Sequence, residues 1–372
     1  MNFAKLGSLL LVAAVVIGCS RSGRVSSSGN ESVPASGQPV FTNAWSEYPS
    51  WSVLGVADLQ KVIDGREGWL GPIEQKWDVD IVLKEADYDT CITLYGNNTV
   101  DSACLTILDS ISPSASRQSV VVGPTSTSAG ADACVVVGIE NIEQLKGKVT
   151  RGLDKSVSRY AFVRNIELKG LDPKDYPFSN MDPAAAAQAL QTNQPEVQSV
   201  MIWQPFVGQT LKTRDGSKVL FDSSTIPNEI IDSIVVGADV LKKPGGENFA
   251  CALLDAYYTV NKFLLDPKTH NETLVALGSK FSSLTAEEMG QIVALEPNQQ
   301  GQRCQFYNTP DKGLSLFGDN KFRSETIPKV LEFCKSYGIV EGAVPANQIG
   351  FNDDNALLNI TDKYIRLVES KQ

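Results

Sequence analysis

Hydrophobic positions in the first two thirds of the chain follow two alternating patterns. Short runs of adjacent apolar residues bounded by turn formers predict buried strands, and the segments between them have one apolar face, as helices do. The first such helix places Val56, Leu59, Val62 and Ile63 on one face. The predicted strands cover residues 40–44, 79–83, 100–105, 119–122, 134–137 and 197–203. Strands that alternate with helices imply right-handed crossovers and a largely parallel sheet, so the predicted fold class is α/β.

The last third of the chain, from Glu247 onward, has mainly helical patterns. They cover residues 252–265, 272–281, 326–337 and 359–368, and we expect these helices to pack on the outside of one half of the molecule. Residues 296–319 are rich in Gln, Gly and Asn and are predicted to form a long loop.

The first nineteen residues have the pattern of a secretory signal peptide. Lys5 precedes an unbroken apolar run from Leu9 to Ile17, which is shorter than the roughly 20 residues needed to span a bilayer. The segment Val16-Ile17-Gly18-Cys19 resembles the lipobox of bacterial lipoproteins. This resemblance implies lipidation of Cys19 and an extracytoplasmic protein anchored to a membrane. The alternative is a buried N-terminal element with an ordinary core cysteine.

Residues 20–39 contain many Ser and Gly and almost nothing apolar. Such a segment buries too little surface to offset the entropy of ordering it, so a flexible spacer is predicted. About twenty residues of this kind span roughly 25 Å on average. The remaining chain, residues 40–372, is long enough for two domains.

Composition narrows the function classes. The chain is 42% hydrophobic, as globular proteins are, and its formal net charge is −10, which becomes −11 when the leader is removed with Lys5. An acidic chain without a basic run is unsuited to nucleic acid, whose binding depends on Lys and Arg near phosphates.

Cysteine and histidine usage argues against a metal site. Cys91, Cys104 and Cys134 lie in apolar runs, where a free cysteine behaves as a small hydrophobic residue. The sequence has no C-x-x-C pair, and His270 is its only histidine, so zinc lacks its usual ligands. We expect no metal and no cofactor.

Candidate ligand-binding residues lie where predicted strands end, because open α/β sheets bind ligands beyond the carboxyl ends of their strands. Small hydroxyl groups beside aromatic rings suit a compact polar ligand, and residues 124–130 are predicted to be a hydroxyl-rich loop. The candidates of this kind are Trp45, Ser46, Glu47, Tyr48, Thr106, Ser126, Thr127, Ser128 and Trp203. For the tryptophans the alternative is packing, and for Glu47 the alternative to an amine contact is a solvated carboxylate.

A second kind of candidate is a predicted helix N-terminus. Ser156, Val157 and Ser158 begin a helix with an apolar face, and a hydroxyl group beside free main-chain N–H groups can bind an anion. The alternative is that Ser156 only caps its own helix, a contact worth about 1 kcal/mol.

No catalytic motif is present in the sequence. It lacks G-x-S-x-G, the P-loop and G-x-G-x-x-G, and His270 is expected in a loop between helices without a nearby nucleophile. We therefore expect a binding protein that is not an enzyme.

An ordered set of segments resembles a known family. The set resembles the solute-binding proteins of ABC importers for taurine, aliphatic sulfonates and nitrate, and the thiamine-pyrimidine synthases of the same fold. The likeness extends from about Phe41 to Val236 and consists of Ala44–Pro49, Gly71 to Ile81, Asp101, Asp109, Gly147-Lys148, Ser156–Tyr160, Gly170-Leu171 and Trp203-Gln204-Pro205.

The resemblance implies a two-lobed fold with the ligand between the lobes. Lobe 1 takes residues 40–129 and 228–372, and lobe 2 takes residues 130–227. The family's function implies capture of a small solute by hinge closure, ABC permease and ATPase subunits as partners, and a monomer. A sensor in place of a permease and a thiamine-pyrimidine synthase-like enzyme are the alternatives. The loop arginine that would clamp a sulfonate has no clear counterpart, so the ligand stays open among sulfonate, taurine, nitrate, amide and amine.

Overall fold

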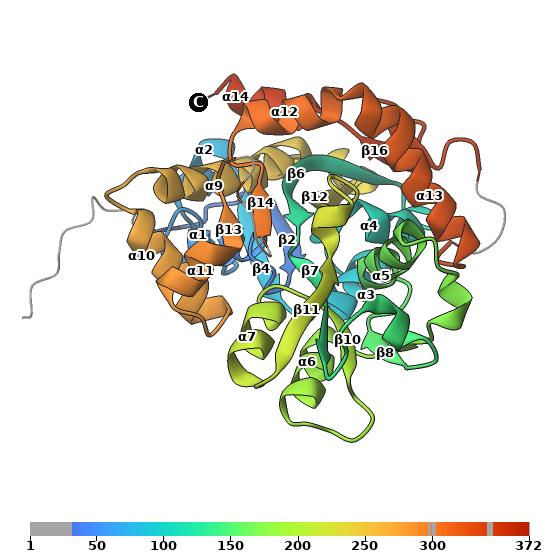
Figure 1. The fold of residues 1–372 in the computed structure, drawn as a ribbon. Coiled ribbons are helices and arrows are strands. Elements are labelled where there is room, and N and C mark those ends of the chain that lie inside the picture. Colours follow the sequence, from blue (N-terminus) through green and yellow to red (C-terminus); the bar gives the residue numbers. More distant parts are fainter. Residues whose placement is uncertain (1–31, 297–298, 300–302, 341–344, 372) are drawn as a thin grey trace, which may run out of the picture.

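The computed structural model describes residues 32–296, 299, 303–340 and 345–371 (Figure 1). The predicted leader, the lipidation site Cys19 and the first part of the predicted spacer lie outside the described residues. The last part of that spacer includes β1 (Val33–Pro34), which pairs with β3 (Trp69–Leu70). The α/β fold class is confirmed, with helices on both sides of two mixed sheets.

The larger sheet combines strands from both ends of the chain. Its order is β13-β14-β6-β12-β5-β2-β4, with β16 also paired to β6 and β15 to β16. The strand β2 is parallel to β4 and β5, whereas β12 is antiparallel to β5 and β6. The strands are β2 (Val40–Trp45), β4 (Asp80–Glu85), β5 (Ser102–Thr106), β6 (Ser119–Ala129), β12 (Ile231–Gly237), β13 (Val293–Ala294), β14 (Arg303–Phe306), β15 (Ile349–Phe351) and β16 (Leu358–Ile360).

The smaller sheet is built from the middle of the chain, in the order β11-β7-β10-β8-β9. The strand β10 is parallel to β8 and antiparallel to β7. The strands are β7 (Asp132–Val137), β8 (Thr150–Gly152), β9 (Phe178–Asn180), β10 (Ser199–Trp203) and β11 (Ser217–Asp222).

Helices cover both sheets. The longest, α9, packs against α1, α2, α10 and α14 and is buried along most of its length (Figure 1). The helices are α1 (Ser52–Leu59), α2 (Pro72–Trp77), α3 (Tyr88–Gly96), α4 (Ile107–Ser114), α5 (Val157–Leu168), α6 (Pro183–Gln191), α7 (Phe206–Thr213), α8 (Ala238–Leu241), α9 (Gly246–Leu265), α10 (His270–Val275), α11 (Ala286–Ile292), α12 (Pro310–Gly318), α13 (Ile327–Ser336) and α14 (Lys363–Glu369).

Three sequence predictions need correction. Residues 124–129, predicted as a loop, continue β6, because β12 and β14 pair with them on opposite sides. The predicted loop 296–319 contains β14 and α12, the latter begun by Pro310 at its first position. The predicted helix 359–368 begins as strand, because Leu358–Ile360 pair with β6 before α14 starts. For the three strands β6, β14 and β16 the deciding partner is far away in the sequence, whereas α12 begins at a local signal, Pro310.

Two segments pass side by side from one sheet to the other. The first leads from β6 into β7, and the second leads from β11 through a short 3₁₀ turn at Ser223–Thr225 into β12. The Ser128 and Ser223 hydroxyl oxygens are 2.6 Å apart, and the Ser128 N–H donates to the Ile230 carbonyl at 3.1 Å. The two sheets are therefore joined by a pair of hydrogen-bonded segments.

Candidate functional site

Two adjoining cavities lie between the two sheets. Strand ends and helix N-termini from both halves of the fold line them. The first has a volume of about 730 Å³ and the second about 460 Å³, within the range of small-molecule sites. Both are lined by Asp89, Leu153 and Asn180, and the two adjoining cavities together are called the cleft below. The first is also lined by Ile92, Asp109, Ser112, Ala115, Ser116, Asp154, Lys155, Ser156, Ile339 and Val340. The second is also lined by Ser46, Glu47, Asp87, Tyr88, Thr90, Asp182, Pro183, Ala184, Trp203 and Phe206.

Helix N-termini converge on the cleft, and each has its first N–H groups bound by a residue of its own turn. Asp87 caps α3 by accepting the Thr90 N–H at 2.8 Å, and Asp182 caps α6 by accepting the Ala185 N–H at 2.9 Å. Ser156 caps α5 by accepting the Ser158 N–H at 3.2 Å. These caps place the positive ends of the three helix dipoles at the cleft wall.

Asp109 is the most deeply buried carboxylate that lines the cleft, with 3% of its surface exposed. Its Oδ2 accepts hydrogen bonds from the Tyr88 hydroxyl at 2.8 Å and the Thr106 hydroxyl at 2.9 Å. Its Oδ1 is buried and has no hydrogen-bond partner among the described residues. Burial raises the pKa of Asp109 to about 7. The two hydroxyl groups and the nearby N–H of Val157 act in the opposite direction and favour its charged form.

Two further buried carboxylates lie behind the cleft, next to the segments that join the sheets. Burial raises the pKa of Asp132 to about 6, opposed by a hydrogen bond with Ser128. Burial also raises the pKa of Asp232, whose Oδ2 lies 2.5 Å from the Ser126 hydroxyl. The negative charges of Asp132 and Asp109 raise the Asp232 pKa further, so the three groups disfavour each other's ionisation.

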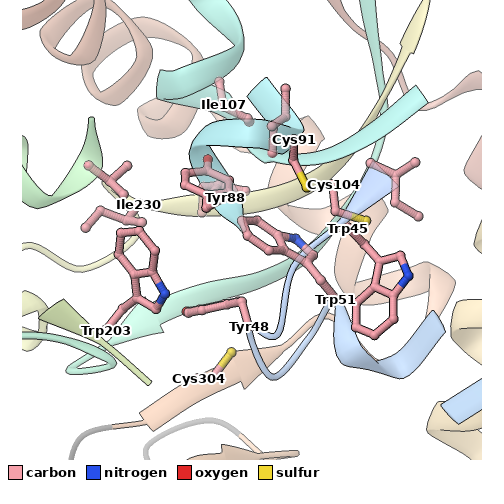
Figure 2. Packing of buried hydrophobic residues seen from close by; sticks show 14 of the residues in the cluster. Trp45, Tyr48, Trp51, Tyr88, Cys91, Cys104, Ile107, Trp203, Ile230 and Cys304 are labelled. Atoms are coloured by element: carbon pink, nitrogen blue, oxygen red, sulfur yellow. The ribbon is translucent and has the colours of Figure 1, made fainter. Parts of the chain in front are cut away.

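Four aromatic rings form a chain through the same region. Tyr48 packs on Trp51 with ring centres 5.0 Å apart, and Trp51 stacks on Tyr88 at 5.2 Å. Tyr88 in turn meets the edge of Trp203 at 5.5 Å (Figure 2). Tyr88 comes from the larger-sheet half and Trp203 ends a strand of the smaller sheet, so this pair bridges the two halves beside the second cavity.

No protein-family model and no curated protein matches the sequence. The fold, in contrast, matches many solved structures. The periplasmic aliphatic sulphonate binding protein SsuA from Escherichia coli is 15% identical, with a TM-score of 0.62 over 83% of this chain and 91% of that protein. The periplasmic nitrate-binding protein NrtA from Synechocystis PCC 6803 is 11% identical, with a TM-score of 0.54 over 84% of this chain and 91% of its own. The alkanesulfonate-binding protein SsuA from Xanthomonas axonopodis pv. citri, bound to MOPS, is 15% identical, with a TM-score of 0.57 over 69% of this chain and 84% of its own.

The chain has the periplasmic-binding-protein fold. At these identities the likeness establishes the fold alone, and the three neighbours are binding proteins for sulfonates or nitrate. Within the periplasmic-binding-protein fold of this chain, four of the residues predicted from sequence line the cleft: Ser46, Glu47, Ser156 and Trp203. Burial raises the pKa of Glu47, and the nearby charges of Glu85, Asp182 and Asp87 add to this effect.

Four other predicted residues are buried just behind the cleft wall. Thr106 caps α4 and binds Asp109, Val157 is the first residue of α5, and Ser158 follows with a buried hydroxyl group that has no hydrogen-bond partner. Tyr48 belongs to the aromatic chain (Figure 2). These side chains support the wall and line neither cavity.

The remaining four predicted residues do not line the cleft. Ser126, Thr127 and Ser128 lie in β6, where their hydroxyl groups bind Asp232, the Ile230 carbonyl and Ser223. Trp45 points to the other side of the Tyr48–Trp51 pair and packs on Phe281 with ring centres 5.1 Å apart (Figure 2). Its position favours the packing interpretation.

Sequence reasoning missed most of the acidic wall. Asp87, Tyr88 and Asp89 follow shortly after the end of β4. Acidic and aromatic residues together at a strand end indicate a binding site, so the sequence did contain a signal for them. Asp109 stands three residues after Thr106, the spacing of a helix cap. Asn180, Asp182 and Phe206 reach the cleft only through the packing of the smaller sheet, and no local pattern marks them.

Histidine and cysteine take no part in the cleft. His270 begins α10, where its Nδ1 lies 2.5 Å from the Leu264 carbonyl, and it lines neither cavity. The six cysteines of the described residues are free and buried, as expected for core positions. The described part of the chain contains no His, Cys, Asp and Glu group arranged to hold a metal ion.

Proposed function

We propose that this protein is an extracytoplasmic, lipid-anchored solute-binding protein that captures a small polar molecule in the cleft and delivers it to an ABC importer. The observation that carries this proposal is the position of the cleft. Its walls come from both halves of a periplasmic-binding-protein fold, and its size suits one small molecule.

The two sheets correspond to two lobes in this proposal, with lobe 1 at residues 40–129 and 228–372 and lobe 2 at residues 130–227. The paired segments at Ser128 and Ser223 are the hinge. A solute that touches both lobes binds the closed form better than the open form and shifts the equilibrium toward closure.

Contacts between lobe 2 and the C-terminal third hold the two lobes together from two sides. The Gln209 amide of α7 donates to the Ser282 carbonyl at 2.6 Å, and Lys212 pairs with Glu288 at 2.8 Å. Across the other side, Tyr160 of α5 meets Phe333 of α13 edge to face at 4.8 Å. These contacts must loosen when the lobes separate, so they set part of the energy difference between the open and closed forms.

Lipidation at Cys19 and the spacer between Cys19 and β1 keep the protein within reach of a permease and its ATPase. Among the described residues, no helix is long and apolar enough to cross a membrane. A monomer suffices for this function, because the cleft is formed by a single chain.

Thermal melting of the mature chain tests the proposal. We expect the melting temperature to rise with at least one class in a panel of sulfonates, taurine, nitrate, amides and amines, without chemical conversion of the bound compound. The alternative, a thiamine-pyrimidine synthase-like enzyme, predicts bound pyridoxal phosphate. Its absorbance in the purified protein, or conversion of a bound compound, would contradict the transport function.

A further inference from the structure

We propose that the solute is a small organic cation that carries a protonated amine, a guanidinium or a quaternary ammonium group. This inference rests on the proposed function and names its ligand class. It differs from the ligands of the three structural neighbours, which are sulfonates and nitrate.

The charges that line the cleft are almost all negative. Around the second cavity stand Glu47, Asp87, Asp89 and Asp182, and no Lys or Arg is among the described residues that line it. Around the first cavity stand Asp89, Asp109 and Asp154, and Lys155 is the only basic residue among the described residues that line it. A cleft whose charges have one sign concentrates ligands of the opposite sign and repels those of the same sign.

The helix N-termini that could hold an anion already have carboxylates beside them. Asp87 is the N-cap residue of α3, and Asp182 is the N-cap residue of α6. The carboxylate of Asp109 faces the Val157 N–H at the start of α5. A sulfonate or nitrate that approached these N–H groups would meet a carboxylate at each, so the feature that makes helix N-termini bind anions is neutralised here.

The hydrogen bonding of Asp109 supplies a further observation. The residue is 3% exposed and lines the first cavity, yet Oδ1 accepts no hydrogen bond from any residue that the structure describes. A buried carboxylate oxygen without a partner is costly, and a bound ammonium or guanidinium group would satisfy it.

Aromatic rings complete the cation-binding character. Tyr88, Trp203 and Phe206 line the second cavity beside its four carboxylates. A cation within about 6 Å of a ring centre is attracted by the negative face of the ring, and this attraction grows when water is excluded. Carboxylates bind the charge of an organic cation, and nearby aromatic rings contact its apolar body. Such a site therefore favours an organic cation over a hydrated metal ion.

Calorimetric titration with matched probes tests the inference. Butylamine and butane-1-sulfonate have the same hydrocarbon chain and opposite charges; 1,4-diaminobutane, choline and nitrate extend the series. We expect at least one of the three cations to bind at least tenfold more tightly than butane-1-sulfonate and nitrate, with affinity that falls as salt rises. Tighter binding of butane-1-sulfonate or nitrate than of every cation would overturn the inference and leave the transport function standing.

Two substitutions locate the site. Asp109→Asn should weaken binding of the best cation at least tenfold. Asp89→Asn alters an exposed residue that lines both cavities, and it should weaken binding two- to fivefold without affecting folding. Glu143→Gln removes one negative charge from an exposed turn outside the cleft and should leave affinity unchanged. Equal affinities in Asp89→Asn, Glu143→Gln and the parent would overturn the inference. If no probe and no co-purified molecule of any class binds, the proposed function itself fails.

Discussion

The hydroxyl group of Tyr88 donates a hydrogen bond to Oδ2 of Asp109 at 2.8 Å inside the protein. The same hydroxyl oxygen accepts the Thr106 N–H at 3.1 Å. Tyr88 therefore ties the start of α3 to the start of α4, while its ring meets the edge of Trp203 from the other half of the fold. Through this one side chain, the position of the Asp109 carboxylate is linked to the packing between the two halves.

Replacing Tyr88 with Phe should lower the free energy of unfolding by about 1–3 kcal/mol, because the Thr106 N–H and one Asp109 oxygen lose a buried partner. Urea unfolding of the ligand-free protein measures this change. Tyr258→Phe is the matched control, because the Tyr258 hydroxyl is buried without a hydrogen-bond partner and its removal should cost nothing. An equal loss in both variants would contradict the role assigned to Tyr88.

Substitutions of the two candidate tryptophans should have different effects on ligand affinity. Trp45→Phe changes a ring that packs on Phe281 outside the cleft, so ligand affinity should stay within twofold. Trp203→Phe changes a ring that lines the second cavity, so affinity for the bound solute should fall by about 1 kcal/mol. Calorimetric titration measures both affinities. A larger affinity loss for Trp45→Phe than for Trp203→Phe would place the site on the other side of the aromatic chain.

Stability should fall as pH rises through the range where the buried carboxylates ionise. In the folded protein the pKa is about 7 for Asp109 and about 6 for Asp132, against an ordinary value of 3.8. The folded state thus binds protons more tightly than the unfolded state, and the stability gained from this is present near pH 4 and lost as pH rises to about 7.

Thermal unfolding of the ligand-free protein between pH 4.5 and 7.5, at constant ionic strength, measures this dependence. Asp109→Asn removes one of the titrating groups, so its melting temperature should fall less steeply with pH than that of the parent. Identical slopes would mean that Asp109 already ionises at its ordinary pKa.

Glu229 joins the second sheet-connecting segment to α5 and α13. Its carboxylate lies 2.5 Å from the Tyr160 hydroxyl, 3.1 Å from Nε of Arg164 and 2.8 Å from Nζ of Lys329. Glu229→Gln should lower the free energy of unfolding by about 1–3 kcal/mol, because Arg164 is largely buried and loses a charged partner. Lys329→Ala, at the exposed end of the same cluster, should cost about 0.5 kcal/mol or less in denaturant unfolding. The reverse order would refute this view of the cluster.

Local signals explain which parts of the fold and site were predictable. Ser156 was found because a helix cap depends on residues within one turn, and Trp203 was found because it directly follows an apolar run. The full length of β6 was not predictable from the sequence. Its last residues are strand because they pair with β14, which lies far along the chain. The burial of Asp109 likewise depends on Tyr88 and on the approach of α5, which are tertiary contacts without a local pattern.

Native mass spectrometry of the freshly purified chain most directly tests the central claim that one small solute is held in the cleft and released unchanged. We expect one bound molecule per chain, lost on denaturation with its mass intact, and weaker retention in Asp89→Asn than in Glu143→Gln. Chemical conversion of the bound molecule on incubation, or equal retention by these two variants, would contradict the account. A chain that purifies empty and retains no compound from the panel would contradict it as well.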